Sequence, residues 1–264
     1  MQRYFIQLSY DGTDYHGWQI QPNGISVQET VEKALSVVAR EKILVTGAGR
    51  TDAGVHASFY VAHFDAEDHR LDTEKILHSI NCLLPSDIAI QSVFKVHSDA
   101  HARFDAFSRT YNYYIGKKKN PFSRRYAAKE ARSPEIEIMN EAASKLFDYQ
   151  DFTSFSKLGT DVKTNNCKVS LAQWKDEGNR IVFTIRANRF LRNMVRAIVG
   201  TLLEVGFRKM SVDDFCKIIE AHDRCGAGAS ADAKGLFLTD IGYSENLSQG
   251  LIRLVNDPNG SDFG

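Results

Sequence analysis

GAGRTDAGVHASFYVAHF, residues 47–64, joins a glycine-rich loop to a segment that is typical of a β-strand. The loop places Arg50 and Asp52 two residues apart, among three glycines that permit backbone angles and close approaches forbidden to other residues. ILVTG before the loop and SFYVAHFDA from Ser58 are rich in β-branched and aromatic residues, which predicts a strand on either side. Three kinds of site would explain such a loop: a phosphate cradle, a metal site, or a nucleophile held for catalysis.

The first two kinds of site fit the sequence poorly. A phosphate cradle requires a GxxxxGK[ST] loop that leads into a helix, whereas residues 47–55 lead into a strand and contain an acid that would repel a phosphate. A metal site needs ligands that converge, but His56 and His63 are seven residues apart, and the HxxxH pattern of His97 and His101 lacks the glutamate of a zincin. We therefore expect no metal here, with His56 bonded to the loop and His63 within its strand.

Asp52 fits a nucleophile better. An aspartate is ordinarily ionised at neutral pH, so it needs no general base, only placement, desolvation and a cation to hold it. In the predicted helix at 189–205, Arg189, Arg192 and Arg196 share one stripe at 100° per residue. Cations in the first turns of a helix oppose its dipole at about 0.3–1 kcal/mol each, and such violations tend to mark functional sites. The arginines indicate an external anion, either a phosphate backbone or the Asp52 carboxylate; a solvated helix face is the alternative.

The strand predicted at 107–116 mixes aromatic and basic residues. Tyr111 and Tyr113 fall on one face of this strand. Aromatic residues on a sheet usually belong to the core, but beside Arg109 and the basic run KKKNPFSRR at 117–125 they could instead stack on RNA bases. The basic run itself is typical of a solvated segment with some phosphate contact.

The remainder of the chain predicts two halves with one order of elements. Period-two patterns predict strands, apolar stripes predict helices, and Ser26 with Glu29 has the form of a capping box. Each half is close to β-α-β-β-α-β, the order of ferredoxin-like units, so we expect an α+β fold with domains at 1–104 and 105–264. The expected strands lie at 4–10, 43–47, 58–66, 88–96, 107–116, 167–174, 180–187 and 235–243, and the expected helices at 27–38, 72–84, 135–147, 189–205 and 211–222.

The composition is that of a globular protein with ample material for a core. The 264 residues include 33 basic and 33 acidic ones, so the net charge gives no hint of nucleic acid and any hint must come from how charges are distributed. Four cysteines without a CxxC pair argue against a disulfide framework or a zinc site. The first residues lack the pattern of a signal peptide, and the apolar run 197–203 is too short to cross a bilayer, so we expect a cytoplasmic protein without a membrane partner.

Six stretches together resemble the tRNA pseudouridine synthases of the TruA type. The resemblance spans nearly the whole chain, and the six stretches in this order are a much more specific signal than any one of them. They are SYDGTDYHGWQIQ near the start, GRTDAGVHA at 49–57, RTYNY at 109–113, DFTSFSK at 151–157, NRFLRNMVRAIVGTLLEVG at 188–206 and KGLFL at 234–238.

The resemblance implies roles for individual residues. Asp52 matches the catalytic aspartate of the family, and Arg196 matches the basic residue that pairs with it. Tyr111 matches the tyrosine that stacks on the target uracil, and Arg50 matches the arginine that helps to displace the target nucleotide. Of the other two arginines in the stripe, Arg189 and Arg192, we expect contacts to the RNA.

The resemblance also implies a fold, an assembly and a reaction. Two α+β domains would meet as one extended, mostly antiparallel sheet with the active cleft between them. A homodimer would bind tRNA and convert uridines at positions 38–40 of the anticodon arm to pseudouridine, without a metal, redox or nucleotide cofactor. The sequence leaves open whether Asp52 attacks the sugar or the base or abstracts a proton. A non-catalytic RNA-binding module and a metal-dependent nucleic-acid hydrolase are the alternative functions.

Overall fold

The first half of the chain forms the antiparallel strands that its alternating residues predict. The computed structural model describes residues 1–67, 73–130, 132–157, 159 and 164–252. In the sheet, β1 lies between β3 and β4 and is antiparallel to both, and the short β2 pairs with β3. The elements are β1 (Gln2–Tyr10), α1 (Val27–Ala39), β2 (Val45–Gly47), β3 (His56–Ala66), α2 (Thr73–Leu83) and β4 (Ile88–Val96).

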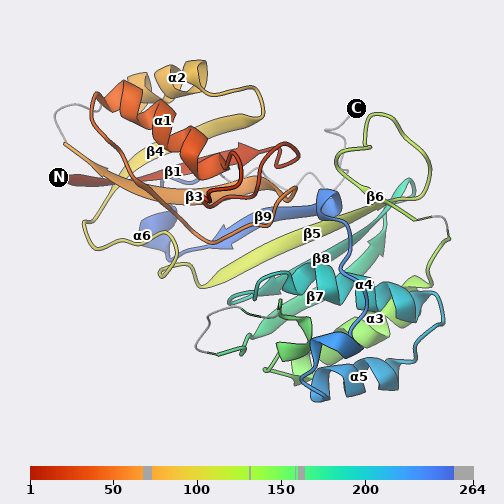
Figure 1. The fold of residues 1–264 in the computed structure, drawn as a ribbon. Helices are drawn as coiled ribbons and strands as arrows, with labels where there is room; N and C mark the ends of the chain where they lie inside the picture. Colours follow the sequence, from red (N-terminus) through yellow and green to blue (C-terminus); the bar gives the residue numbers. More distant parts are fainter. Residues whose placement is uncertain (68–72, 131, 158, 160–163, 253–264) are drawn as a thin grey trace.

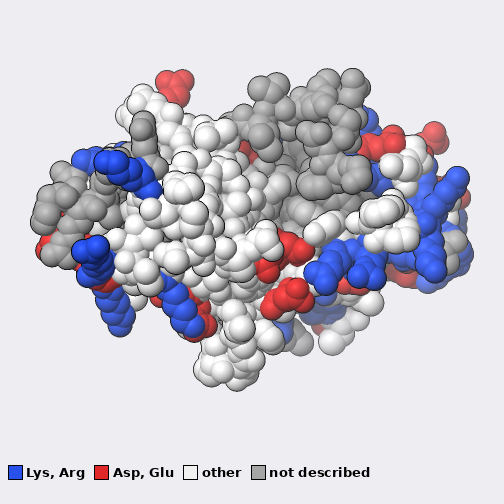
Figure 2. Space-filling view, turned by 90° about the horizontal axis from the view of Figure 1, so that it is seen from above, with Lys and Arg blue, Asp and Glu red and all other residues white. Residues whose placement is uncertain are grey.

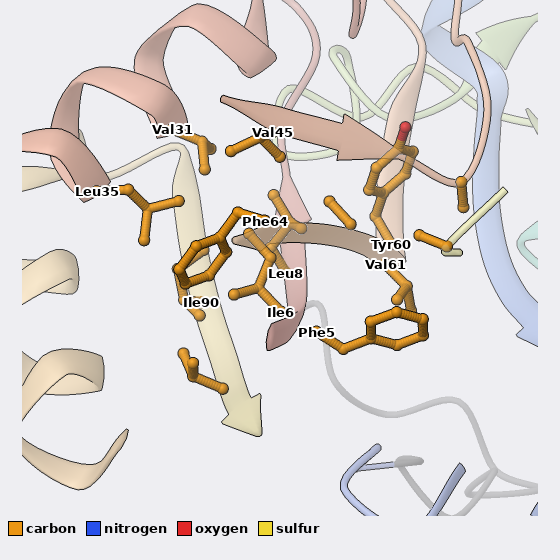
Figure 3. Packing of buried hydrophobic residues seen from close by; sticks show 14 of the residues in the cluster. Phe5, Ile6, Leu8, Val31, Leu35, Val45, Tyr60, Val61, Phe64 and Ile90 are labelled. Atoms are coloured by element: carbon orange, nitrogen blue, oxygen red, sulfur yellow. The ribbon is translucent and has the colours of Figure 1, made fainter. Parts of the chain in front are cut away.

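Helix α1 begins where the sequence predicts. Ser26 Oγ accepts a hydrogen bond from the backbone N–H of Glu29 at 3.2 Å, which is one half of the predicted capping box. The Glu29 carboxylate pairs with Lys33 along the helix. Val31 and Leu35 of α1 point down onto buried side chains of β1, β3 and β4, so this helix covers one face of the first-half sheet (Figure 3).

The second half also forms antiparallel strands with helices packed over them. β8 pairs with both β5 and β7, and α3, α4 and α5 lie together over these strands (Figure 1). The polar segment after β5 contains the short strand β6, which pairs with β5; the sequence predicts no element there. The elements are β5 (Ser108–Gly116), β6 (Ala128–Lys129), α3 (Ile136–Ser144), β7 (Val169–Asp176), β8 (Arg180–Ala187), α4 (Met194–Gly206), α5 (Val212–Glu220), β9 (Leu236–Gly242) and α6 (Glu245–Ser248).

Strand β9 joins the two halves into one sheet. It runs parallel to β3 through the pair His56 and Phe237, and antiparallel to β5 through the pair Tyr111 and Leu238. The described strands follow the order β4-β1-β3-β9-β5-β8-β7, with β2 and β6 attached to β3 and β5. The fold is therefore α+β with a large, open, mostly antiparallel sheet, as expected, and Tyr111 lies two strands from the strand that follows Asp52.

Two hydrophobic cores lie along this sheet. The C-terminal segment crosses back to the first core, where Tyr243 and Leu247 are buried. It is fixed there by the Gln7 amide, which exchanges two hydrogen bonds of 2.7 Å with the backbone of Ile252. Within the described ranges, no helix has the length and apolar character needed to cross a bilayer.

Helix α4 starts later than the sequence predicts. Asn193 has φ 66°, a left-handed conformation that an α-helix does not contain, so the helix begins at Met194 and not at Arg189. The prediction that Arg189 and Arg192 share a helical stripe with Arg196 is therefore wrong. Only Arg196 lies in the first turn of α4, and the argument from the helix dipole applies to it alone.

Candidate active site

The loop that carries Asp52 is fixed by close backbone contacts with residues 12–18. A Cβ atom on Gly12 would lie 2.0 Å from the carbonyl oxygen of Val55, and one on Gly17 would lie 2.3 Å from that of Thr51. Gly17 also has φ 85°, a conformation that favours glycine. The glycines near the start of the chain are therefore needed because this segment packs directly against the Asp52 loop.

Buried aromatic residues hold the same loop from its other side. The hydroxyls of Thr51 and Tyr10 are hydrogen-bonded at 2.9 Å, and both residues are buried. The Tyr60 hydroxyl donates to the backbone carbonyl of Gly49, and its ring stacks on Trp18 with centroids 4.1 Å apart. These contacts fix the backbone on both sides of Arg50 and leave Asp52 at the surface. Sequence patterns did not identify them, because the partners are far apart in the chain.

Asp52 faces two arginines from the second half. Its Oδ1 lies 3.6 Å from Arg192 Nε, and its Oδ2 lies 3.9 Å from Arg196 Nη1. These distances are longer than hydrogen bonds, so the three groups form a loose ion-pair cluster. The Asp52 side chain is 26% exposed and Arg196 is 22% exposed, so the carboxylate is partly shielded yet open to a ligand.

Arg196 is held by a loop that packs on α4. Its Nε donates to the carbonyl of Ala231 at 2.7 Å, and the N–H of Ala231 donates back to the Arg196 carbonyl at 2.9 Å. The loop approaches so closely that a Cβ on Gly200 would lie 1.8 Å from the carbonyl oxygen of Ala229. Asn193, at the start of the helix, donates to Ser230 at 2.6 Å. Gly200 is thus required for this contact, which aims one side of the Arg196 guanidinium at Asp52.

Tyr111 lies half-buried on β5, with its ring packed edge-on against Phe190 at 5.2 Å between centroids. Burial raises the pKa of Tyr111 to about 12, with the Arg109 guanidinium acting in the opposite direction and the Asp52 charge adding to the increase. The phenol is therefore protonated at neutral pH and can donate a hydrogen bond. Tyr113, in contrast, is buried in the second core, and its hydroxyl donates to the carbonyl of Asp232 at 2.9 Å.

Arg109 is a structural residue, although its sequence context suggested a contact to RNA. Its guanidinium donates to the carbonyls of Ala106 at 2.7 Å, Asn188 at 2.9 Å, Ala48 at 3.0 Å and Arg103 at 2.7 Å. These four carbonyls belong to the loop before Asp52, the loop before β5 and the segment that leads to Arg192. One half-buried cation therefore fixes the mutual position of the three segments around the site.

The remaining predicted residues lie around this cluster. Arg50 is exposed and makes no hydrogen bond or ion pair with the part of the chain that the structure describes. Arg189 donates to the carbonyl of Thr164 at 3.2 Å. The structure thus brings Arg192 and Arg196 to Asp52, leaves Arg50 free on the same loop, and ties Arg189 to a neighbouring segment.

The histidines near the loop make local contacts. His56 Nδ1 accepts a hydrogen bond from the N–H of Gly12 at 3.1 Å, and His63 Nδ1 accepts one from Ala102 at 3.1 Å. Burial lowers the pKa of both imidazoles. Among the residues whose positions are described, no three His, Cys, Asp or Glu side chains form a group suited to a metal ion.

Comparison with known proteins gives one consistent family. The family model described as tRNA pseudouridine synthase matches residues 7–105 and 142–244, more than half of the chain. A tRNA pseudouridine synthase A from Bacteroides fragilis is 59% identical over 248 residues, which are 94% of this chain and 98% of the relative. The corresponding protein of Bacteroides thetaiotaomicron is 60% identical over 94% of this chain and 93% of its own length. One from Limosilactobacillus reuteri is 40% identical over 93% of this chain and 98% of its own length.

Proposed function

This chain belongs to the tRNA pseudouridine synthase family, and we propose that it converts uridine to pseudouridine in tRNA with Asp52 as the catalytic group. In that reaction the C1′–N1 bond of uridine breaks, the uracil rotates, and C1′ joins C5. The proton on C5 is lost and N1 gains one, so the composition does not change. The observation that supports Asp52 is its position: a carboxylate on a rigid loop, facing two arginines that come from the other half of the chain.

The arginines suit a carboxylate that must react while ionised. Each partly exposed ion pair at this distance is typically worth up to about 1 kcal/mol, and both arginines favour the charged form of the same carboxylate. Because Arg196 already donates to Ala231, its orientation is fixed before substrate arrives. Arg192 is more exposed, at 52%, and can also contact a phosphate of the RNA. Arg196 would thus position Asp52, and Arg192 would contribute to both Asp52 and the substrate.

A target base inside a stacked arm must leave the stack, at a cost of a few kcal/mol. Arg50 is exposed on the same loop as Asp52 and is suited to fill the vacated space. Tyr111 would stack on the detached uracil, and its protonated phenol is a hydrogen-bond donor and not a base. This arrangement favours Asp52 over Tyr111 as the group that reacts with the nucleotide.

The finer features of the function are also proposals. We expect uridines at positions 38–40 of the anticodon arm as targets, a homodimer as the assembly and the cytoplasm as the location. The orders β4-β1-β3-β2 and β9-β5-β8-β7 support two ferredoxin-like domains that share the sheet at β9. Figure 2 shows its densest group of Lys and Arg side chains at the end where β6 lies in Figure 1, with some Asp and Glu beside them, and this group supports contact with RNA phosphates.

Tritium release from uracil C5 tests the reaction and its positions together. Each unmodified tRNA transcript would have a uridine with tritium at C5 at only one of positions 38, 39 and 40. We expect release from at least one of them by the wild type. Release only from uridines elsewhere in the tRNA would contradict the assignment of these positions.

Two variants test the roles in the cluster. We expect Arg196→Ala to lose at least about 100-fold in single-turnover rate, because a positioned charge next to the reacting group is typically worth this much. Arg208→Ala, which breaks an exposed ion pair with Glu135 just beyond the C-terminal end of α4, should keep the wild-type rate. Equal rates in the two variants would contradict the role of Arg196.

The alternative is a module that binds RNA without catalysis. It would use the same arginines, but it gives no reason for a carboxylate among them, since Asp52 weakens phosphate binding. Tight binding of tRNA by the wild type, with no tritium release from any uridine, would favour this alternative.

A further inference from the structure

The loop between β4 and β5 presents two aromatic side chains that the proposed mechanism does not use. Phe104 is 74% exposed and Phe107 is 63% exposed. The Arg103 guanidinium lies 5.7 Å from the centre of the Phe104 ring, and Arg103 is exposed as well. A large aromatic ring beside a cation, both open to solvent, has the chemistry of a surface that stacks on a nucleobase and contacts its phosphate.

The backbone of this loop is fixed, so the ring is presented before any ligand binds. His101 Nδ1 accepts hydrogen bonds from the N–H groups of Arg103 at 3.1 Å and Phe104 at 3.3 Å. Asp105 accepts one from the N–H of His101 at 2.8 Å, which also directs this carboxylate toward the backbone. The Phe104 ring rests against the His101 ring at 4.2 Å between centroids. One side of Phe104 is thus supported by protein, and the rest is open.

Arg109 places this loop next to the Asp52 loop. A single nitrogen of its guanidinium, Nη2, donates both to the carbonyl of Ala48 and to the carbonyl of Arg103, at 3.0 and 2.7 Å. The backbone of Arg103 is therefore adjacent to a residue only four positions before Asp52. Arg50 is exposed on that loop and makes no hydrogen bond or ion pair with the residues that the structure describes. Both Arg103 and Arg50 are exposed, so each guanidinium can contact a phosphate of the RNA.

We propose that Phe104 and Arg103 form a stacking platform for an unpaired base of the tRNA, the immediate neighbour of the target uridine. This inference rests on the proposed function. Flipping the uridine out leaves one face of the neighbouring base uncovered, and stacking on an aromatic side chain is worth about 1–3 kcal/mol per base. Phe104 replaces the lost stacking and Arg103 contacts the adjoining phosphate, so the platform holds the RNA while Asp52 reacts.

A cycle of protein and RNA changes tests the platform. Dissociation constants would be measured for wild type, Phe104→Ala and Phe104→Leu with an anticodon-arm transcript, intact or with an abasic nucleotide immediately 5′ or 3′ of the target. We expect the wild type to lose about 5- to 100-fold in affinity with one of the two abasic transcripts. Both Phe104 variants should bind the intact and the abasic transcript equally, with the affinity that the wild type has for the abasic one. The reason is that without the Phe104 ring the neighbouring base has nothing to stack on. Phe147→Ala, which removes another exposed phenylalanine in the 3₁₀ turn Lys145–Asp148, should behave as wild type.

If the losses of binding free energy caused by Phe104→Ala and by the abasic nucleotide simply add, the platform is overturned. Unchanged affinity for the intact transcript in both Phe104 variants would also overturn it. A shift in the sedimentation of Phe104→Ala toward smaller species would assign the ring to a second copy of the chain and overturn it too. Binding does not require turnover, so a wild type that shows the predicted cycle but releases no tritium would contradict the proposed function and leave the platform standing.

Discussion

Gly17→Ala, compared with Gly178→Ala, tests whether the segment at 12–18 positions Asp52. The two glycines have nearly the same backbone conformation, φ 85° and φ 81°. A Cβ on Gly178 meets no atom within 4 Å, whereas one on Gly17 would lie 2.3 Å from the carbonyl oxygen of Thr51 and 3.1 Å from the carbonyl carbon of Asp52. The pair therefore separates the cost of the backbone conformation from the cost of displacing the loop.

The expected magnitudes follow from these contacts. A left-handed alanine costs about 1–2 kcal/mol, so Gly178→Ala should lose about that much free energy of unfolding and no activity. Gly17→Ala should lose the same amount for its left-handed conformation and about 1–3 kcal/mol more because its Cβ overlaps the carbonyl oxygen of Thr51. Because real Cβ contacts stay above 3.0 Å, the backbone of Thr51 must shift by roughly 0.7 Å. A displacement of this size at a reacting group costs on the order of 10- to 100-fold in rate.

Urea unfolding and single-turnover tritium release at saturating tRNA would be measured for wild type and both variants, at a temperature where all three are folded. We expect Gly178→Ala to keep the wild-type rate and Gly17→Ala to lose it by the factor above. A Gly17→Ala protein that is destabilised but reacts as fast as Gly178→Ala would refute the view that this contact sets the position of Asp52.

Two further predictions concern the groups around the loop. Arg109→Met leaves four carbonyls without their common donor, so it should lower the free energy of unfolding by at least about 3 kcal/mol in urea titrations. Arg109→Lys should lower it by less. A loss below about 1 kcal/mol in Arg109→Met would contradict the view that Arg109 holds the three segments together. Burial lowers the pKa of His63 from 6.5 to about 4, so between these values only the unfolded chain binds the proton and stability falls as pH falls through this window. Urea unfolding should show a loss of about 2 kcal/mol between pH 7 and pH 5 that His63→Gln lacks, and equal pH profiles in the two proteins would contradict it.

Local patterns predicted the elements of this fold well, and for physical reasons. The Ser26 cap and the apolar stripe of α1 depend on neighbours within four residues, so the sequence contains the whole signal. The strands follow alternation, which also depends on near neighbours. The parallel contact of β9 with β3 joins residues about 180 positions apart, and no periodicity encodes it. The expectation that the two halves share one sheet therefore came from the resemblance and not from pattern, and the order of the strands was not predicted.

The site divides along the same line. Asp52 and Arg50 stood out because glycine-rich loops with charged residues are unusual locally. The role of Arg109 could not be inferred, because its four partners are carbonyls from three segments and carry no side-chain signal. The helical stripe of arginines was wrong because a single residue, Asn193, adopts a left-handed conformation and shortens α4. Arg192 nevertheless reaches Asp52, from the loop before the helix.

The most direct test of the central claim is Asp52→Asn, which removes the charge and keeps the size of the side chain. Binding of tRNA and release of tritium from uracil C5 would be measured side by side with the wild type. We expect the variant to bind tRNA as well as the wild type or more tightly, because a carboxylate near the phosphates is gone, and to release no tritium. Release by Asp52→Asn at the wild-type rate would contradict the assignment of Asp52 as the catalytic group.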